Sequence, residues 1–216
     1  MNRRKLLCVV TVCSGLFISL LNSNCCFSKT AVDENTSKSV NGNLAGLDVA
    51  NEQYKQGLNY AKYGLYDEAI EMYKKSLLRE PNNSDAYKNM GIAYLQKEKY
   101  DEAIEALQKV IELKPKDYDA CYTLGTAYFD KGIYDKAIEN FRKTLQTNPE
   151  HKATFFLLGI AYAKVGKYDD AIKMLKKRIE FDPNLAIAYS NLGIVYSMKG
   201  SDKEAFAEFR KALDID

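Results

Sequence analysis

The feature that most constrains this 216-residue chain is the even spacing of its prolines. There are four, and each follows the previous one after 34 residues: Pro81, Pro115, Pro149 and Pro183. When every unit is numbered from 1, starting at Ala50, position 8 is Gly, position 11 is Tyr and position 20 is Ala in all five units. A period of this length without insertions predicts one small structural unit stacked on copies of itself.

Each unit is predicted to form two helices joined by a turn. In the second unit Tyr87, Met90 and Tyr94 recur at intervals of three and four residues, which places them on one face of a helix. A Gly in four of the five units then indicates a turn, and an aromatic–Asp pair supplies a cap or a first-turn anion for a second helix. The proline at position 32 ends that helix.

Small residues at positions 8 and 20 are predicted to let the two helices of a unit approach closely. Large residues at positions 4, 7, 11 and 24 then fill the remaining space. A single hairpin cannot bury both of its faces, so each unit is predicted to stack on the next.

These columns resemble the tetratricopeptide repeat family over residues 50–216. The resemblance implies an all-α fold, a right-handed α-solenoid of antiparallel helix hairpins, in which the first helices line a concave groove. It also implies protein or peptide binding and no catalysis. The sequence departs from the pattern at Gln53 and Cys121, where position 4 is not aromatic, and at Asp202, where the other units have Tyr. No capping helix is expected after position 31 of the fifth unit. The units are 50–83, 84–117, 118–151, 152–185 and 186–216.

The first 28 residues predict an export signal. A positive start, MNRRK, precedes an apolar run from Leu6 to Leu21, which is short for a membrane-spanning helix and typical of a signal peptide. Three fates remain open. In the first, the chain is cleaved before Cys25 and lipidated there, because LNSNC resembles a bacterial lipoprotein signal. In the second, it is cleaved after Ser28. In the third, it keeps an uncleaved anchor. Each fate places the rest of the chain outside the cytoplasm, in the cell envelope or secreted. Residues 29–49 are polar and predict a flexible linker.

Composition and charge exclude several classes of function. The 16 Tyr and 9 Phe are too many for a disordered chain. The formal charge is +2, and without three positive residues of the leader it becomes −1, so nothing argues for nucleic acid binding.

The single histidine, His151, is expected at the surface without a partner, and Cys121 is expected as a small buried hydrophobe. Within the repeats there are no closely spaced pairs of zinc ligands such as Cys and His, and the glycines there follow the 34-residue period. Neither a metal nor another cofactor is therefore predicted, and an enzyme is a remote alternative.

If the first helices line the groove, positions 2, 5, 9 and 12, with neighbouring position 6, face its interior. They predict an apolar and aromatic groove with a few amide and hydroxyl groups, suited to an extended segment or an amphipathic helix. Family members that bind acidic chain ends use a clamp of Lys, Asn and Arg, which only Lys88 and Asn89 resemble. The alternative is that part of the set packs between units. The candidate groove residues are Tyr54, Leu58, Lys88, Asn89, Ile92, Leu95, Tyr122, Thr126, Phe129, Phe156, Ile160, Asn191 and Ile194.

The sequence thus predicts a non-catalytic protein–protein interaction scaffold outside the cytoplasm, which binds a protein or peptide segment in its groove. A membrane tether would be the lipidated Cys25 or an uncleaved anchor. The alternative is an envelope assembly factor that self-associates into a homo-oligomer. That alternative rests on the fifth unit, whose second helix is expected to expose Phe206, Phe209 and Leu213.

Overall fold

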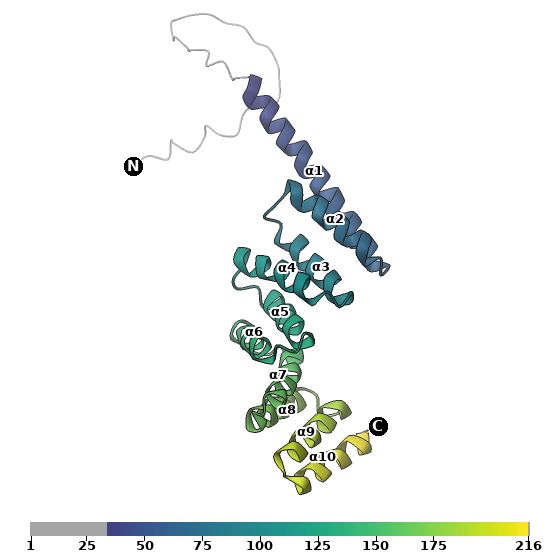
Figure 1. Ribbon diagram of the computed structural model, residues 1–216, viewed down its shortest axis with the longest axis vertical. Helices are drawn as coiled ribbons and strands as arrows, with labels where there is room; N and C mark the ends of the chain where they lie inside the picture. The colour runs from purple at the N-terminus through teal and green to yellow at the C-terminus, as the bar shows by residue number, and fades with distance from the viewer. Residues whose placement is uncertain (1–33, 216) are drawn as a thin grey trace, which may run out of the picture. The chain divides into compact units, whose positions relative to one another are not determined.

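The computed structural model describes the backbone of residues 34–215 and the side chains from Gly46 onward. Residues 34–215 form ten α-helices and no strand (Figure 1). The chain divides between Ser39 and Val40, and every contact described below lies within the unit that begins at Val40. The helices are α1 (Glu34–Lys62), α2 (Tyr66–Arg79), α3 (Ser84–Gln96), α4 (Tyr100–Leu113), α5 (Tyr118–Asp130), α6 (Tyr134–Thr147), α7 (Lys152–Lys164), α8 (Tyr168–Phe181), α9 (Ala186–Lys199) and α10 (Asp202–Ile215).

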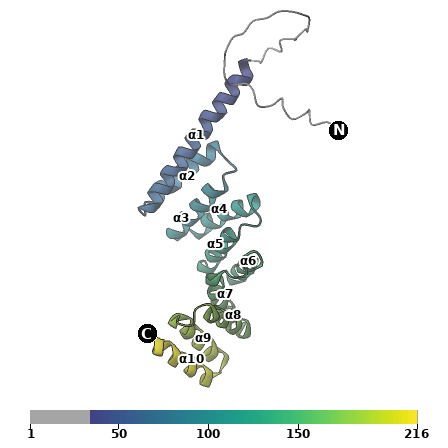
Figure 2. The same cartoon turned by 180° about the vertical axis from the view of Figure 1, so that it is seen from behind.

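The helices pair into antiparallel hairpins. We call α1, α3, α5, α7 and α9 the first helices, and α2, α4, α6, α8 and α10 the second helices. Four first helices begin at the residues where the sequence units begin, Ser84, Tyr118, Lys152 and Ala186. Short turns join each first helix to its second helix, and the hairpins follow one another in chain order in both views (Figures 1 and 2). The predicted all-α solenoid class is confirmed.

The first helix, α1, is longer than the repeat requires. The sequence predicts a flexible linker over 29–49, but the helix begins at Glu34 and continues to Lys62. Adding residues to the end of a helix that already exists is far easier than starting one, which accounts for the extension into a polar segment. The predicted signal segment 1–28 and its lipidation site, Cys25, lie outside the described residues. None of the helices within 34–215 is long and apolar enough to cross a membrane.

The helix ends decide between the two roles expected for the repeated aspartates. The residue before α2, Leu65, makes no side-chain capping bond, and Asp67 lies in the first turn instead. Asp101 occupies the same place in α4. These aspartates therefore act as first-turn anions, which the helix dipole favours. In contrast, α3 is capped by Asn83, whose side-chain oxygen accepts a hydrogen bond of 2.9 Å from the amide of Ala86.

The turn inside each hairpin requires a left-handed residue. Gly200 follows α9 with a φ of 83°, and glycines stand at this place in three other units. The second unit has Glu98 there, with a φ of 56°. This conformation costs a non-glycine residue roughly 1–2 kcal/mol, so the second unit keeps the common turn at the expense of backbone strain.

In each hairpin a glycine of the first helix lies against a large side chain of the second helix, and we call this contact the glycine lock. A Cβ atom on Gly125 of α5 would lie 2.7 Å from the ring of Phe141 in α6, closer than real Cβ contacts. Ala137 and the other alanines at position 20 are buried. The close approach predicted from the small residues is therefore confirmed. The other glycines at position 8 meet position 24 of their own unit in the same way, at Tyr73, Leu107, Leu175 and Phe209.

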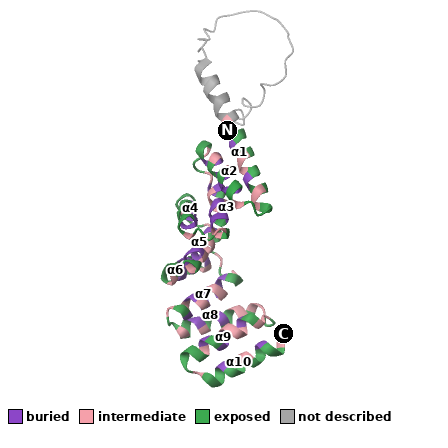
Figure 3. Cartoon of the chain, turned by 45° about the vertical axis from the view of Figure 1, so that its right-hand side comes forward, coloured by how far each residue is buried: buried purple, intermediate pink, exposed green. Residues whose placement is uncertain are grey.

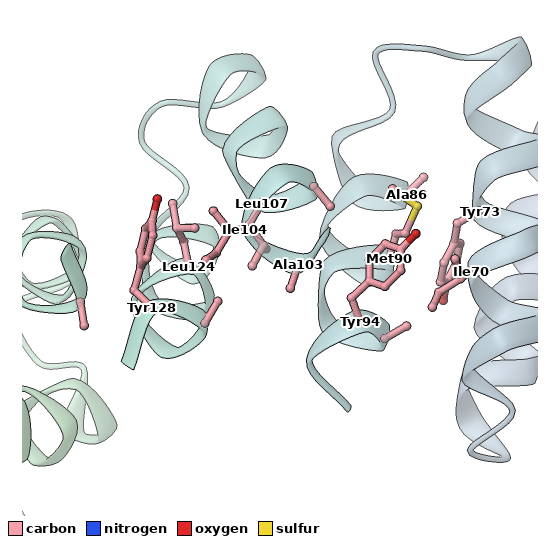
Figure 4. Close-up of a cluster of buried hydrophobic side chains, with 14 of the residues drawn as sticks. Ile70, Tyr73, Ala86, Met90, Tyr94, Ala103, Ile104, Leu107, Leu124 and Tyr128 are labelled. Carbon is pink, nitrogen blue, oxygen red and sulfur yellow. The ribbon is translucent and has the colours of Figure 1, made fainter. Parts of the chain in front are cut away.

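Successive hairpins bury their apolar faces against each other. In Figure 4, Ile70 and Tyr73 of α2 face Met90 and Tyr94 of α3 across the junction of two units. Figure 3 shows buried residues on the helix faces that meet and exposed residues on the faces that point away. Contact between neighbours therefore stabilises the array, as expected for a repeat protein.

A lysine–aspartate pair recurs where consecutive units meet. The lysine stands at position 14 of one unit and the aspartate at position 18 of the unit before it. The pairs are Lys97–Asp67, Lys131–Asp101 and Lys199–Asp169. At the junction of the third and fourth units, Val165 stands in place of the lysine and packs against the core.

Candidate functional site

The first helices lie on the inner side of the stack. Among the described residues α3 contacts α5, α5 contacts α7 and α7 contacts α9, whereas no second helix contacts another second helix. The stack therefore bends toward its first helices. We call the surface formed by the accessible side chains of the first helices the inner face.

The predicted groove residues all belong to first helices and all keep part of their surface accessible. Leu58, Ile92 and Ile194 are exposed. None of the others is fully buried, but several of them, such as Tyr54, Leu95 and Tyr122, pack against the core, so the alternative that part of the set packs between units stays open. Their role in binding stays a prediction. The half-buried members are Tyr54, Lys88, Asn89, Leu95, Tyr122, Thr126, Phe129, Phe156, Ile160 and Asn191.

Polar side chains on the inner face of the first two units contact other residues of the protein. The Asn89 side-chain amide donates a hydrogen bond of 3.0 Å to the Tyr54 hydroxyl and one of 2.8 Å to the backbone carbonyl of Asp85. The Lys88 ammonium lies 3.8 Å from the Asp117 carboxylate. Burial raises the pKa of the Tyr54 hydroxyl, which therefore stays neutral. The two residues that resemble a clamp for acidic chain ends thus already have partners within the protein.

A cavity of about 250 Å³ lies where the third, fourth and fifth units meet, and we call it the three-unit cavity. Tyr122 of α5 and Phe156 of α7, both predicted as groove residues, line it together. No single unit forms this cavity. Its volume suits one or two side chains of a bound segment better than a cofactor. The rest of its wall is Ala153, Leu157, Arg178, Leu185 and Ile187.

Packing fixes the aromatic wall of the cavity. The Tyr122 ring centroid lies 6.0 Å from that of Phe141, which is fully buried, and 4.7 Å from the His151 ring. Burial raises the pKa of the Tyr122 hydroxyl. A neutral, well-packed aromatic side chain loses little conformational entropy on binding, which suits an anchor for an apolar ligand group.

His151 differs from its sequence prediction as a surface residue without a partner. Its Nδ1 lies 2.7 Å from the Thr154 hydroxyl, and its ring packs against Tyr122. The prediction was wrong because His151, the last residue of the third unit, packs against Tyr122 of the same unit and contacts Thr154 at the start of α7. Cys121 is buried, as expected, and burial raises the pKa of its thiol. Among the described residues, no three side chains of metal-ligand type come together.

Sequence reasoning missed five of the seven residues that line the cavity. Ala153 and Ile187 stand at position 2 and Leu157 at position 6, which are columns that the repeat places on the inner face. Leu185 lies in the connection between units, for which the repeat gives no signal. Arg178 belongs to a second helix, and its signal is a charge in a column that is otherwise neutral.

A second accessible apolar surface lies on α10. Phe206 is 75% exposed and Leu213 is 77% exposed, and their spacing of seven residues places them on one helix face. Phe209 was expected to be exposed with them, but this is wrong. It stands at the locking position 24, and its ring fills the space 2.6 Å from where a Cβ atom on Gly193 would lie.

Comparison with known proteins identifies the family. Models described as tetratricopeptide or TPR repeats match residues 60–124, 161–200 and 186–216. The model described as anaphase-promoting complex, cyclosome, subunit 3 matches residues 96–178. A solved structure of MamA is 32% identical, and the match covers 74% of this chain and 93% of that chain with a TM-score of 0.71. The chain belongs to the tetratricopeptide repeat family.

Two further solved structures share the fold at lower identity. MamA from Desulfovibrio magneticus RS-1 is 24% identical over 78% of this chain and 95% of that chain, with a TM-score of 0.76. YrrB, described as a TPR protein with an unusual peptide-binding site, is 24% identical over 85% of this chain and 93% of that chain, with a TM-score of 0.72. No curated protein matches the sequence. The family fold supports a protein-interaction scaffold.

Proposed function

We propose that the protein is a non-catalytic scaffold that binds an extended protein or peptide segment along its inner face. The three-unit cavity carries this proposal, because aromatic side chains from two successive first helices surround a space of side-chain size. Pockets of this kind take individual side chains of a bound segment, and a few such anchors contribute most of the affinity. A peptide-binding site is described for YrrB on the same fold, and this supports the assignment.

Truncation of the aromatic wall tests the binding site. Peptides selected from a random decapeptide display library on the wild-type protein serve as probes, and fluorescence anisotropy measures their affinity. Tyr122→Ala and Phe156→Ala are each expected to raise Kd at least about 10-fold, because each removes an anchor contact. Leu78→Ala is the control, since this side chain is 82% exposed on a second helix. Unchanged Kd values in two folded cavity variants would contradict inner-face binding.

We also propose that the protein acts outside the cytoplasm, tethered to a membrane by lipidated Cys25. The support is the positive and apolar leader followed by a cysteine. Intact-mass measurement of the mature protein tests this, with Cys25→Ser as the control. A mature chain that begins at Cys25 and carries added lipid mass is expected. A chain that begins after Ser28, or one that keeps the leader, would contradict the lipid tether.

Self-association in an envelope assembly is a second candidate function. The observation that favours it is the apolar pair on α10, Phe206 and Leu213, both largely exposed. Large apolar side chains that share one accessible helix face commonly mark an interface. The two candidate functions use different surfaces, so both can operate in one protein.

A further inference from the structure

One position of the repeat changes character in the fourth unit. Position 27 faces the core of each unit, and four units fill it with a neutral residue that is buried. The fourth unit has Arg178 there, which replaces a small neutral side chain by a long cation. The repeat pattern gives no structural reason for this exception, because the neighbouring units pack in the same way without it. The four neutral residues are Ser76, Val110, Thr144 and Ala212.

The guanidinium of Arg178 is incompletely satisfied within the protein. Its side chain is only 14% exposed, and its Nη1 is buried without a hydrogen-bond partner. Its Nη2 lies 3.5 Å from the carboxylate of Asp182, whose side chain is 46% exposed and therefore remains partly hydrated. A buried cationic donor without a partner destabilises the fold, and a small neutral residue in this column would avoid that cost. Asp182 leaves much of the Arg178 charge uncompensated, and a ligand carboxylate beside the accessible part of this side chain would balance it.

The same arginine lines the three-unit cavity, whose other walls are apolar except for the Tyr122 hydroxyl. A cation beside an apolar space of side-chain size attracts a carboxylate, because apolar walls screen the charge less than bulk water does. The planar guanidinium also matches the geometry of a carboxylate better than an ammonium does. Phe156, Leu157 and Ile187 then remain to contact an apolar neighbour of that carboxylate.

We propose that the three-unit cavity selects an acidic side chain, Asp or Glu, next to a large apolar residue within the bound segment, and that Arg178 is its specificity-determining residue. This inference rests on the proposed function. Accessible inner-face residues occur on both sides of the cavity, at Phe129 and at Ile194, so a segment can continue past it in both directions. For this reason we assign the carboxylate to a side chain rather than to a chain terminus.

Panning of the random decapeptide library on wild type and on Arg178→Met tests the proposal. Peptides selected on wild type are expected to be enriched in Asp or Glu beside Leu, Ile, Phe or Met. Selection on Arg178→Met is expected to keep the apolar preference and to lose the acidic one. Lys177→Met is the matched control, because it removes the same charge from the adjacent, solvent-exposed position of α8, and it should keep the acidic preference.

Synthetic peptides give the same test without altering the protein. Replacing the selected Asp or Glu by Asn or Gln is expected to raise Kd at least about 10-fold on wild type and less than about twofold on Arg178→Met. Amidation of the peptide C-terminus should leave Kd unchanged. A large loss of affinity on amidation would show that the protein binds a chain terminus instead. Arg178→Met should remain folded, because a neutral residue already fills this column in the other units.

The outcomes separate the inference from the proposed function. If wild type selects apolar peptides without acidic enrichment, or if Arg178→Met keeps that enrichment, the role of Arg178 is wrong while segment binding stands. If wild type selects no peptide, segment binding fails and the inference fails with it.

Discussion

The glycine at position 8 has no side chain, and this determines how closely the two helices of each hairpin approach. Gly125 leaves the space that the Phe141 ring occupies, and this ring is fully buried. Because neighbouring atoms surround the ring, it has no room to move away from an added methyl group. Glycine is otherwise unfavourable inside a helix, by roughly 0.5–1 kcal/mol relative to alanine. Its contribution to this fold is therefore steric, and it outweighs the helix propensity of the residue.

Gly125→Ala is expected to lower the free energy of unfolding by about 1–3 kcal/mol through overpacking against Phe141. Urea denaturation followed by circular dichroism measures this change. Gly46→Ala is the control, because nothing lies within 4 Å of a Cβ atom added in that part of α1. The control should be neutral or slightly stabilising. If the two variants prove equally mild, close helix approach does not explain the glycine column.

At the scale of the element, the inter-unit ion pairs align the end of one first helix with the start of the preceding second helix. The Lys97 ammonium holds the Asp67 carboxylate in this way. Both side chains are accessible to solvent, so the pair contributes little to global stability. Its effect is local, and it shows in the protonation of the carboxylate. The hydrogen bond from Lys97 lowers the pKa of Asp67 below its usual range.

Lys97→Met is expected to raise the pKa of Asp67 toward its usual value, which carboxyl-detected NMR can follow. Since the pKa is lowered in the folded protein, the pair stabilises above the ordinary carboxyl pKa. This contribution is lost as the pH falls through the lowered value. Lys131→Met removes the same lysine at the next junction and should leave the pKa of Asp67 unchanged. An unchanged pKa in Lys97→Met would show that the pair does not form in solution.

At the scale of the whole molecule, the two proposed functions use two separate surfaces, the inner face and the exposed apolar surface of α10. The inner face needs several consecutive units, because the three-unit cavity draws its wall from three of them. The α10 surface belongs to one helix and carries Phe206 and Leu213. A change on α10 should therefore alter assembly without altering peptide affinity.

Sedimentation equilibrium tests the α10 surface. The wild-type protein is expected to sediment above its monomer mass at high concentration, and Phe206→Ser together with Leu213→Ser should return it to the monomer. Burial of two large apolar side chains favours association, and their replacement by serine removes that gain. Leu78→Ser, on exposed surface of α2, is the control and should not change the mass. A wild-type protein that is monomeric at every concentration would remove this candidate function.

Repetition explains which features were predictable from the sequence. The contact of Gly125 with Phe141 was predictable because the same two columns recur in every unit. The three-unit cavity was not predictable, because its wall combines residues of three units and because Arg178 differs from the neutral residues at position 27 of the other units. The start of α1 was also missed, since it depends on the extension of an existing helix into Glu34 and the residues that follow. Periodic positions carry the fold and most of the cavity wall, whereas the proposed selectivity rests on one exception, Arg178.

The glycine locks have a mechanical consequence, because each one joins two helices of the same hairpin. Hairpins hold their neighbours by apolar faces and accessible charges, while each keeps its own lock. Tension applied to the two ends would therefore peel hairpins away one after another instead of breaking the array at once. The hairpins that have not yet detached would keep the contact between their two helices. The chain would therefore lengthen in steps under load and refold hairpin by hairpin when the tension is released.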